Sequence, residues 1–442
     1  MKSRFSVALG FLALIAAGAV FLASPWARAA GVWGEPLTAV FTACSAVCVT
    51  GLSVVDIAAE YSRVGQIAIL ALVEIGCLGL MTLGTFFIVA IGHRLSLARE
   101  FTLVDAYGVA GVQGLKGLIL WVVGSMLVVE ALVAGVLYCR LEDVYHSVFF
   151  SIMGFCNAGF SVLPGSLAAF ASDPVVVLVL ALETILGGIG FLVIYNLCTF
   201  RFRRRFGAGR AGRLSLHSRV VLRATALLLL LSFAAFLLIE WHGVLEGLPF
   251  ARKLWTAFYQ AVTPRTCGFT LVQVESLHPL TRHLYSVLMF IGGAPGSAAA
   301  GMKVTTFAVL AYTLLAMCRG ESETVIGRRT LPYEIVREAI VILMALVAFA
   351  VLVSAALLVT EHGAGLQVDA IVFESISAIT TTGLSMGDTT SNLSAAGKIV
   401  IMVAMFIGRL GALTIVMMIG DRETVRHIRY PQESLAVGEV RR

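Results

Sequence analysis

Long apolar runs alternate with short polar stretches along the whole chain. Eight runs are long enough to be membrane-spanning helices, because a helix needs roughly 20 apolar residues to cross the hydrocarbon core of a bilayer. They lie at about 6–24, 64–92, 116–138, 174–199, 219–240, 282–317, 334–360 and 396–420. The runs are continuously apolar rather than alternating, which excludes the pattern of a membrane β-barrel. The chain is therefore predicted to be an all-α integral membrane protein.

Four further helical segments are too short to span, and each precedes a polar stretch that contains glycine. They lie at about 35–48, 143–156, 252–265 and 367–380. The polar stretches read VCVTGLSVV, FCNAGFSVL, RTCGFTLV and TTTGLSMG, each with a glycine followed by Leu or Phe and then Ser or Thr. The glycines Gly51, Gly159, Gly268 and Gly383 are 108, 109 and 115 residues apart. Such a nearly constant period indicates an internal repeat.

A second mark follows each of these stretches, inside the next apolar run. It reads IGCLG at 75–79, LGGIG at 186–190, IGGAPG at 291–296 and IGRLG at 407–411. Each unit is therefore predicted to be a helix, a re-entrant half-helix, a polar loop and a second helix with small residues at mid-depth. The predicted repeats cover 1–95, 96–205, 206–325 and 326–420, and a tail follows at 421–442.

Composition and charge support a membrane location and suggest an orientation. The chain is 59% hydrophobic and 13% charged, whereas soluble domains carry about 25% charged residues. The segment 201–223 holds eight arginines and 319–337 holds four, whereas 141–172 and 361–397 hold no Lys or Arg. Because positive charge marks the cytoplasmic side, both termini are predicted inside and the polar glycine stretches face outward. The orientation signal explains the basic segments better than nucleic-acid binding, so no nucleic-acid partner is expected.

The first apolar run also resembles a signal peptide, since Lys2 and Arg4 precede it and ARA at 27–29 resembles a cleavage site. The repeat needs this run as the first helix of its first unit. We therefore expect the helix to be retained.

The four polar stretches raise the question of why non-helical backbone lies at membrane depth. Such backbone is tolerated only where it is buried in protein or lines a water-filled path. Four loops around one axis form a ring of carbonyls, which can replace the hydration shell of an alkali cation. Glycine accepts positive φ, and the C-terminal ends of the half-helices favour a cation. These features predict an ion-selectivity filter near 48–52, 156–160, 265–269 and 380–384.

The residues predicted to form this filter are Val49, Thr50, Gly51, Asn157, Ala158, Gly159, Thr266, Cys267, Gly268, Thr381, Thr382 and Gly383. The alternative is that Gly and Ser only permit close helix packing. That alternative suffices for a single segment, but four copies in register on one side favour the filter.

The stretch GGAPGSAAAGMK, at 292–303, interrupts the sixth apolar run. Its many small residues weaken a helix, and its proline removes a backbone donor. We predict an irregular loop that narrows the pore below the filter; the alternative is a packing kink. The predicted gate residues in it are Gly292, Gly293, Pro295, Gly296, Ser297, Gly301 and Lys303.

Arg409 lies in the middle of the last apolar run and is the remaining predicted gate residue. A charge at membrane depth is costly and usually faces a cavity or a partner. Our hypothesis is that Arg409 lies beneath the filter against the third-repeat loop and acts as an electrostatic barrier to cations. The alternative is a structural salt bridge with Glu74 or Glu183.

Other charged residues lie close to the polar stretches. Asp56, Glu374 and Asp388 are expected near the outer mouth, where they either attract cations or form an ordinary solvated surface. Arg265 directly precedes the third filter stretch and is expected to brace the ends of the half-helices, since cations are favoured at helix C-termini.

No motif for catalysis or metal binding accompanies these features. The eight cysteines show no C-x-x-C spacing, so a disulfide framework or zinc site is not expected. The chain has no G-x-x-x-x-G-K-[ST] motif and no kinase or hydrolase constellation. It is therefore predicted not to be an enzyme and to hold no cofactor, and any nucleotide control must come from another protein.

Taken together, these motifs resemble the superfamily of K⁺ transporters that comprises the Trk, Ktr and HKT proteins. VTGLSVVD, NAGFSVL, TPRTCGF and TTGLSMG match its four filter motifs in order. GGAPGSAAAGMKVTTF matches its intramembrane loop, and FIGRLGALT matches the second helix of its fourth repeat. The resemblance covers essentially the whole chain. Eight spans without an extra N-terminal pair are closer to the Ktr-type pore subunit.

The resemblance implies a fold and a function. The fold is four tandem helix–pore-loop–helix repeats, with eight spanning helices and four re-entrant half-helices, around one central pore. The function is K⁺ uptake across the inner (cytoplasmic) membrane, driven by the electrochemical gradient, with Na⁺ dependence or symport left open. The partners implied are a second copy in a homodimer and a cytosolic RCK-type regulatory ring that binds ATP, ADP or an NAD-type nucleotide. K⁺ at the filter residues is the only metal implied.

Two details of the filter bear on selectivity. In the family a serine at the first glycine position accompanies Na⁺ transport, so Gly51 favours K⁺. Cys48, Cys156 and Cys267 stand where the family more often has Thr, Asn or Ala, which leaves altered selectivity or redox sensitivity open. The competing functions are a secondary transporter that couples Na⁺ or H⁺ to a solute and the K⁺-translocating subunit of an ATP-driven pump.

Overall fold

The computed structural model describes residues 2–90, 111–163, 165–205, 214–363 and 365–411, and this part of the chain is mostly helical. By length and composition, three of its helices can cross a membrane, and one bent pair provides a fourth candidate. The count of eight spans therefore stays a prediction. The predicted repeat boundary near 95, the end of the eighth run at 412–420 and the tail at 421–442 lie outside the described residues.

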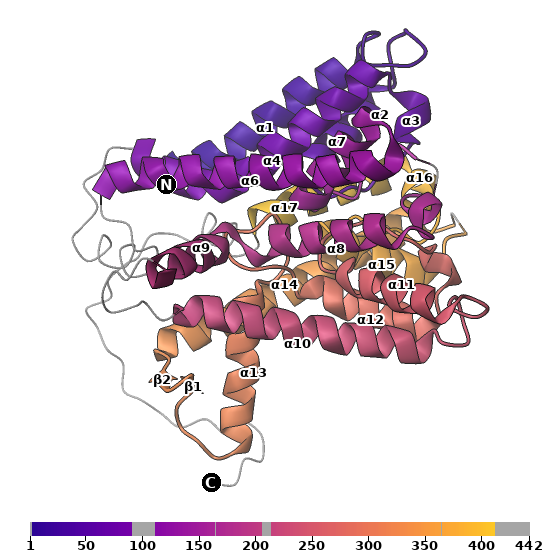
Figure 1. The fold of residues 1–442 in the computed structure, drawn as a ribbon. Coiled ribbons are helices and arrows are strands. Elements are labelled where there is room, and N and C mark those ends of the chain that lie inside the picture. Colours follow the sequence, from indigo (N-terminus) through magenta and orange to yellow (C-terminus); the bar gives the residue numbers. More distant parts are fainter. Residues whose placement is uncertain (1, 91–110, 164, 206–213, 364, 412–442) are drawn as a thin grey trace.

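The elements follow one another along the chain as labelled in Figure 1. They are α1 (Lys2–Ala23), α2 (Pro36–Val47), α3 (Ile57–Glu60), α4 (Arg63–Ala90), α6 (Gly111–Leu141), α7 (Val144–Cys156), η1 (Ala168–Phe170), α8 (Pro174–Ile189), α9 (Phe191–Arg205), α10 (Leu216–Ile239), α11 (Phe250–Val262), η2 (Val274–Ser276), α12 (Pro279–Phe290), α13 (Val304–Cys318), β1 (Val325–Ile326), β2 (Arg329–Thr330), α14 (Tyr333–Thr360), α15 (Val368–Ile379), α16 (Thr389–Asn392) and α17 (Ala395–Leu410).

Short helices are present at the four places where half-helices were expected. These are α2, α7, α11 and α15, and their bounds differ from the expected ones by only a few residues. Their starts are defined locally, since α2 has a proline in its first turn and Asp143 caps α7 with its carboxylate. Each ends immediately before its polar, glycine-containing stretch, so all four present their C-terminal ends to those stretches.

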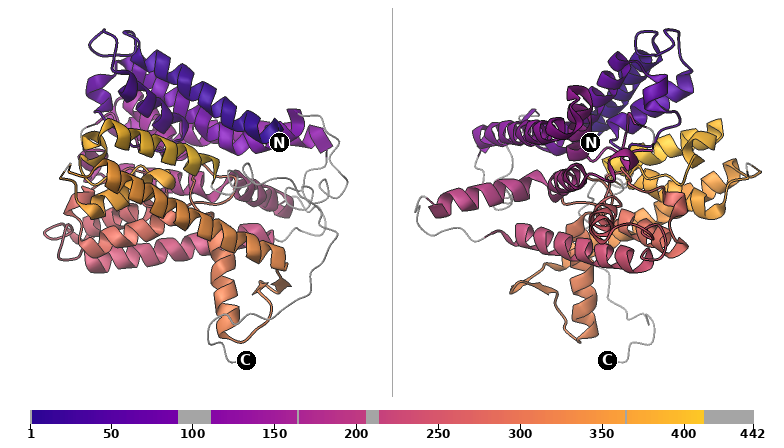
Figure 2. Two further views of the ribbon diagram at one scale, coloured as in Figure 1. Left: turned by 180° about the vertical axis from the view of Figure 1, so that it is seen from behind. Right: turned by 45° about the vertical axis from the view of Figure 1, so that its right-hand side comes forward.

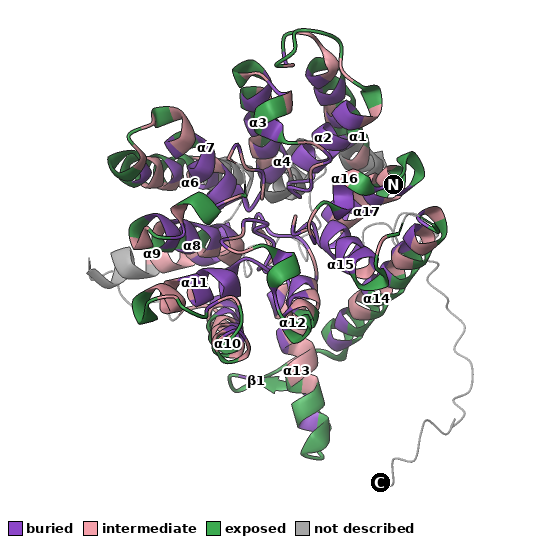
Figure 3. Cartoon of the chain, turned by 90° about the vertical axis from the view of Figure 1, so that its right-hand side faces the viewer, coloured by how far each residue is buried: buried purple, intermediate pink, exposed green. Residues whose placement is uncertain are grey.

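The helices are arranged around a common centre, where buried loop segments meet (Figure 3). The second long helix of each unit packs against the short helix of the next unit. The pairs are α4 with α7, α8 with α11, α12 with α15, and α17 with α2. The last pair joins the end of the described chain to its beginning and closes the ring. The first helix, α1, packs on α2 and α4 and is an integral part of this arrangement.

Two of the expected spans are broken. The run at 174–199 was expected to be continuous, but it bends by 96° between α8 and α9. The break is at Gly190, whose φ of +89° is left-handed and therefore suits glycine. The run at 282–317 is interrupted as expected, since α12 ends at Phe290 and α13 begins at Val304.

Helix α13 and the hairpin that follows it project from the side of the helical bundle (Figure 1 and Figure 2). The hairpin pairs β1 with β2 in antiparallel register, with Val325 opposite Thr330 and Ile326 opposite Arg329. Its turn contains Gly327 at a φ of +59°. The sequence patterns did not predict this hairpin.

Buried carboxylates join the two long helices of the third and fourth units at one end. Glu240, which follows α10, accepts hydrogen bonds from the backbone N–H of His278 at 2.9 Å and the hydroxyl of Thr281 at 2.6 Å. Glu361, which follows α14, accepts from the N–H of Ser394 at 3.0 Å and from its hydroxyl at 2.7 Å. Each carboxylate thus satisfies donors at the start of the partner helix, which the helix itself cannot satisfy.

The first and second units use ion pairs for the same connection. Arg140 near the end of α6 lies 2.8 Å from Asp173, the residue that caps α8. Arg28, which follows α1, pairs with Glu60 just before α4. All four units therefore hold their two long helices together at the same end, although with different residues.

The Glu361 contact predicts a stability effect. Glu361→Ala should lower the free energy of unfolding by about 1–3 kcal/mol, because the N–H and the hydroxyl of Ser394 lose hydrogen bonds to a charged acceptor. The measurement is the thermal unfolding midpoint of the purified protein in detergent. Glu334→Ala, at an exposed position at the start of α14, should leave the midpoint unchanged. An equal shift in both variants would contradict the assigned role.

Candidate functional site

Each short helix is followed by the same unusual backbone turn. Val49, Asn157, Thr266 and Thr381 have φ values of 54°, 56°, 69° and 47°. This left-handed region is uncommon for residues other than glycine. All four stand two positions before the glycine of their motif. Because the same strained conformation recurs with four different local sequences, the geometry of the site rather than the residue type imposes it.

The residue between this turn and the glycine is tied back to the short helix. In each loop its N–H donates to a carbonyl in the last turn of that helix or, for Cys267, to the residue that caps its end. The bonds are Thr50 to Ser45 at 2.8 Å, Ala158 to Met153 at 2.9 Å, Cys267 to Thr263 at 3.1 Å and Thr382 to Ser377 at 2.9 Å. The four loops therefore have fixed starts, and the backbone of each enters the centre of the molecule from the same kind of anchor.

The four motif glycines contact one another in chain order, and we call them the glycine ring. A Cβ placed on Gly51 would lie 2.5 Å from the nitrogen of Gly159, and one on Gly159 would lie 2.6 Å from the Cα of Gly268. A Cβ on Gly268 would lie 2.8 Å from the carbonyl oxygen of Thr382. One on Gly383 would lie 3.3 Å from the Cα of Gly51, which closes the ring. Backbone meets backbone at every position, so no side chain fits.

Carbonyl oxygens of the anchored residues face this ring. The oxygen of Thr50 lies against Gly383, and that of Cys267 lies 3.1 Å from the Cβ position of Gly159. With Thr382, three of the four anchored residues turn their carbonyls toward a neighbouring loop. Ala158 differs, because its carbonyl accepts the N–H of Phe160 at 2.8 Å. The site therefore gathers backbone oxygens from separate units.

The side chains around the ring are buried and polar. Thr50, Asn157, Thr266 and Thr381 are each at most 1% exposed. Within the described residues, the hydroxyls of the three threonines have no hydrogen-bond partner, which is unusual for buried polar groups. The expected filter residues thus share one buried location, rich in oxygen atoms, at the centre of the molecule.

A second set of glycines explains the marks in the second helices. They allow the carbonyl ends of the short helices to approach the second helix directly. A Cβ added to Gly76 would lie 2.9 Å from the carbonyl carbon of Val47. A Cβ added to Gly187 would lie 3.0 Å from the carbonyl carbon of Phe155, and one added to Gly408 would lie 2.7 Å from that of Ile379. These glycines position the short helices and, through them, the loops.

The intramembrane loop, at 291–303, packs against the break between α8 and α9. Ala294 donates its N–H to the carbonyl of Gly188 at 2.9 Å, and Phe191 donates to the carbonyl of Gly296 at 3.1 Å. A Cβ on Gly190 would lie 2.9 Å from the carbonyl oxygen of Pro295. LGGIG predicted only small residues within a continuous helix, because its three glycines permit a break but do not by themselves require one.

Further hydrogen bonds fix the loop internally. Gly292 donates its N–H to Met302 at 2.9 Å, and the carbonyl of Gly293 accepts from Val304 at 2.9 Å. The hydroxyl of Ser297 donates to Ala294 at 2.6 Å, and Lys303 Nζ donates to Ala299 at 2.6 Å. Gly296 and Gly301 are left-handed, with φ values of 70° and 69°. The expected gate residues thus belong to one ordered, irregular loop rather than to a kinked helix.

Arg409 connects this loop to two other units. Its side chain is buried, and its two terminal nitrogens donate to the carbonyl of Ala298 at 2.6 Å and to that of Gly76 at 3.3 Å. Among the described residues no carboxylate lies within 4.0 Å of it. The alternative of a salt bridge with Glu74 or Glu183 is therefore wrong. Its contact with the third-unit loop is as expected, and its role as a barrier to cations stays a prediction.

With this geometry established, comparison with known proteins assigns the family. The profile of the TrkH family, described as cation transport protein, matches residues 22–425. This chain belongs to the TrkH family of cation transport proteins.

Individual members of the family are similar over nearly the whole chain. The Ktr system potassium uptake protein B of Bacillus subtilis is 36% identical and covers 98% of this chain and 96% of its own length. The potassium/sodium uptake protein NtpJ of Enterococcus hirae is 32% identical, and the match covers 98% of this chain and 96% of that protein. The crystal structure of the potassium transporter TrkH from Vibrio parahaemolyticus superposes with a TM-score of 0.73 at 18% identity, over 94% of this chain and 84% of that one. It shares the fold.

Two expectations about charges around the site in this TrkH-family chain need correction. Arg265 was expected to brace the half-helix ends, but its guanidinium donates to the carbonyl of Gly292 at 3.3 Å and so links the third polar stretch to the intramembrane loop. Glu374 was expected at the outer mouth, but it is fully buried and accepts hydrogen bonds from Ser385 at 3.0 Å and from Thr390. It braces the loop after the fourth glycine, so it is not a vestibule charge.

Asp56 and Asp388 are exposed, as either interpretation of the outer mouth requires. Asp56 caps α3 by accepting the N–H of Ala58 at 2.8 Å.

The cysteines are all free thiols. The thiol of Cys267 lies 3.4 Å from the hydroxyl of Thr184 and 3.8 Å from the hydroxyl of Tyr259. This thiol, in the third polar stretch of the TrkH-family chain, thus lies between two hydroxyls.

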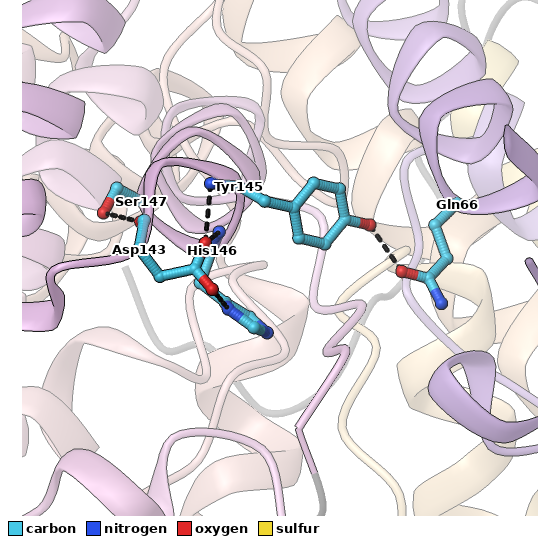
Figure 4. Close-up of polar contacts among 5 residues, drawn as sticks. All are labelled: Gln66, Asp143, Tyr145, His146 and Ser147. Carbon is cyan, nitrogen blue, oxygen red and sulfur yellow. Dashed lines mark hydrogen bonds and ion pairs between the residues drawn. The ribbon is translucent and has the colours of Figure 1, made fainter. Parts of the chain in front are cut away.

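The start of the second short helix is held from two directions (Figure 4). Asp143 accepts the backbone N–H groups of Tyr145 and His146 at 2.8 and 3.1 Å, and Ser147 donates to its carbonyl at 2.6 Å. Hydrogen bonds from His146 lower the pKa of the Asp143 carboxyl, and the bond from the His146 ring contributes more than the bond from its backbone N–H. The hydroxyl of Tyr145 donates to Gln66 of α4 at 2.5 Å. The cap and this bond together fix α7 against the neighbouring unit.

The glycines under the short helices give a testable prediction. Gly408→Ala should destabilise the protein by about 1–3 kcal/mol, because its methyl group collides with the carbonyl of Ile379 and forces overpacking. Among the described residues nothing lies within 4 Å of the methyl group that Gly135→Ala would add in α6, so this variant should be neutral or stabilise the protein by roughly 0.5–1 kcal/mol. Thermal unfolding in detergent compares the two. A Gly408→Ala variant as stable as Gly135→Ala would contradict the packing role.

Proposed function

We propose that this chain takes up K⁺ across the cytoplasmic membrane through a gated, channel-like pore, with a selectivity filter made by its four loops. The glycine ring carries the proposal, because four backbone segments that meet without side chains leave carbonyl oxygens as the chemistry of the site. The proposed filter residues are Val49, Thr50, Gly51, Asn157, Ala158, Gly159, Thr266, Cys267, Gly268, Thr381, Thr382 and Gly383. K⁺ is the cargo, with no resident cofactor proposed.

Physical chemistry supports this assignment. Carbonyl oxygens replace the hydration shell of K⁺ in known filters, and the C-terminal ends of four short helices add negative potential at the same place. A negative cell interior supplies about 2.3 kcal/mol per charge per 100 mV, so uptake needs no catalysis by this chain. Relatives named for potassium uptake, and one for potassium and sodium uptake, favour K⁺ and leave a role for Na⁺ open.

We propose further that the intramembrane loop and Arg409 form the gate. The hydrogen bonds that join Arg409 to Ala298 and Gly76 place its charge beside the loop, and a fixed positive charge close to a narrow path opposes the entry of a cation. The proposed gate residues are Gly292, Gly293, Pro295, Gly296, Ser297, Gly301, Lys303 and Arg409.

The surroundings of the pore are also proposals. We assign both termini to the cytoplasm, because the arginine-rich segments 201–223 and 319–337 mark that side. We propose a homodimer in which each chain holds its own pore. A cytosolic RCK-type ring that binds ATP, ADP or an NAD-type nucleotide is proposed to dock on the basic cytoplasmic loops at 201–218 and 319–333, since this chain has no nucleotide-binding motif of its own.

The filter is tested by ⁸⁶Rb⁺ uptake into proteoliposomes that hold the purified protein, with K⁺ or Na⁺ as competitor. K⁺ should block uptake and Na⁺ should not. Gly51→Ser should reduce this discrimination by about tenfold or more, which needs only ~1.4 kcal/mol of altered relative binding. The control Gly124→Ser, in an open position of α6, should behave as the wild type. Unchanged discrimination in a folded Gly51→Ser protein would refute the filter.

The gate is tested by the charge at Arg409. Arg409→Gln should raise the rate of ⁸⁶Rb⁺ uptake several-fold, because it removes the fixed charge while keeping a polar side chain. Arg409→Lys keeps the charge and should stay close to the wild-type rate. If both folded variants transport at the wild-type rate, Arg409 holds the loop in place without opposing cations.

A further inference from the structure

A cavity lies away from the proposed pore, between α10, α13 and the β1–β2 hairpin. Its volume is about 130 Å³, well above the 10–15 Å³ that one water needs. Its walls are mainly apolar, with Phe307, Ala311 and Tyr312 from α13 and Ile326 from the hairpin. The same cavity is lined from α10 by two arginines, Arg219 and Arg223. It thus combines a cationic side with an apolar one.

The two arginines have no countercharge in the described part of the chain. They stand four residues apart and therefore on one face of the helix. No carboxylate described in the structure lies within 4.0 Å of either one. The Nε atom of Arg219 is fully buried and has no hydrogen-bond partner among the described residues. Because an unpaired buried donor on a cation is costly, this wall of the cavity suits an anion.

The position of the cavity selects the kind of anion. It lies at the N-terminal end of α10, whose helix dipole adds positive potential, and beside the projecting helix α13 (Figure 1). From the cavity onward α10 exposes Leu227, Leu230 and Leu231, which are 56%, 64% and 57% exposed. A soluble anion gains nothing from that leucine surface, whereas an amphipathic anion covers it.

We propose that this cavity binds the headgroup phosphate of an anionic phospholipid. Arg219 and Arg223 hold the phosphate, as basic pockets between spanning helices do for acidic lipids. Tyr312 and Phe307 enclose the glycerol region, and the acyl chains follow the exposed leucines of α10. The site is separate from the glycine ring and the intramembrane loop, so it is independent of the proposed transport function.

Native mass spectrometry of the purified full chain tests the site. The protein is exchanged in detergent into phosphatidylglycerol or phosphatidylcholine, and the fraction that retains lipid is measured. The wild type should retain phosphatidylglycerol in preference to phosphatidylcholine. The double variant Arg219→Gln/Arg223→Gln should retain about tenfold less. Arg337→Gln, an exposed arginine at the start of α14, is the matched charge control and should retain as much as the wild type.

A second variant separates lipid loss from misfolding. Ala311→Trp fills the cavity but keeps both arginines, and it should also lose the retained phosphatidylglycerol. Thermal unfolding confirms that each variant is folded. In a further arm, millimolar inorganic phosphate should neither stabilise the wild type nor displace the lipid. Equal retention by wild type and both variants would overturn the proposal. Stabilisation by inorganic phosphate without lipid preference would assign the site to a soluble anion instead and would overturn it as well.

Discussion

Direct contact between the backbones of four loops is the constraint on which the rest of this structure depends. The glycine ring leaves no room for a Cβ at any of its positions, so each loop must be held accurately by elements outside the ring. That requirement explains the left-handed turn after every short helix and the N–H bonds that anchor each loop. It also explains the glycines at 76, 187 and 408, because the ends of three short helices rest directly on them. Site and scaffold are therefore two parts of one packing arrangement.

The intramembrane loop is the second place where all four units meet. The loop belongs to the third unit, and the break between α8 and α9 in the second unit hydrogen-bonds to it. Arg409 of the fourth unit donates both to this loop and to Gly76 of the first unit. Arg265, beside the third glycine-containing stretch, donates to Gly292 in the same loop. A movement of the loop must therefore change contacts in every unit, as the proposed gate requires.

The repeated motifs made much of this arrangement predictable. The Gly-Leu/Phe-Ser/Thr pattern located the four short helices and their loops, and the interruption of the sixth run located the intramembrane loop. The bend at Gly190 was not predicted, because a helix-breaking φ there depends on packing against Pro295, which is far away in sequence. The burial of Glu374 was missed for a similar reason, since its partners Ser385 and Thr390 return to it only after the loop has turned. Sequence patterns report local preference, whereas these two features come from contacts between segments.

The pairing of α17 with α2 has a consequence for how the protein is made. The thiol of Cys44 in α2 bonds to the carbonyl of Met402 in α17, 358 residues later in the chain. At ~5–20 residues synthesised per second, the partner of α2 is completed roughly 20–70 s after α2 itself. During that interval the first unit lies in the bilayer with one flank of its short helix uncovered. A nascent chain that stops before the fourth unit can form every local turn and still lack the α17–α2 contact that closes the ring of helices, so folding can finish only after the fourth unit has been made.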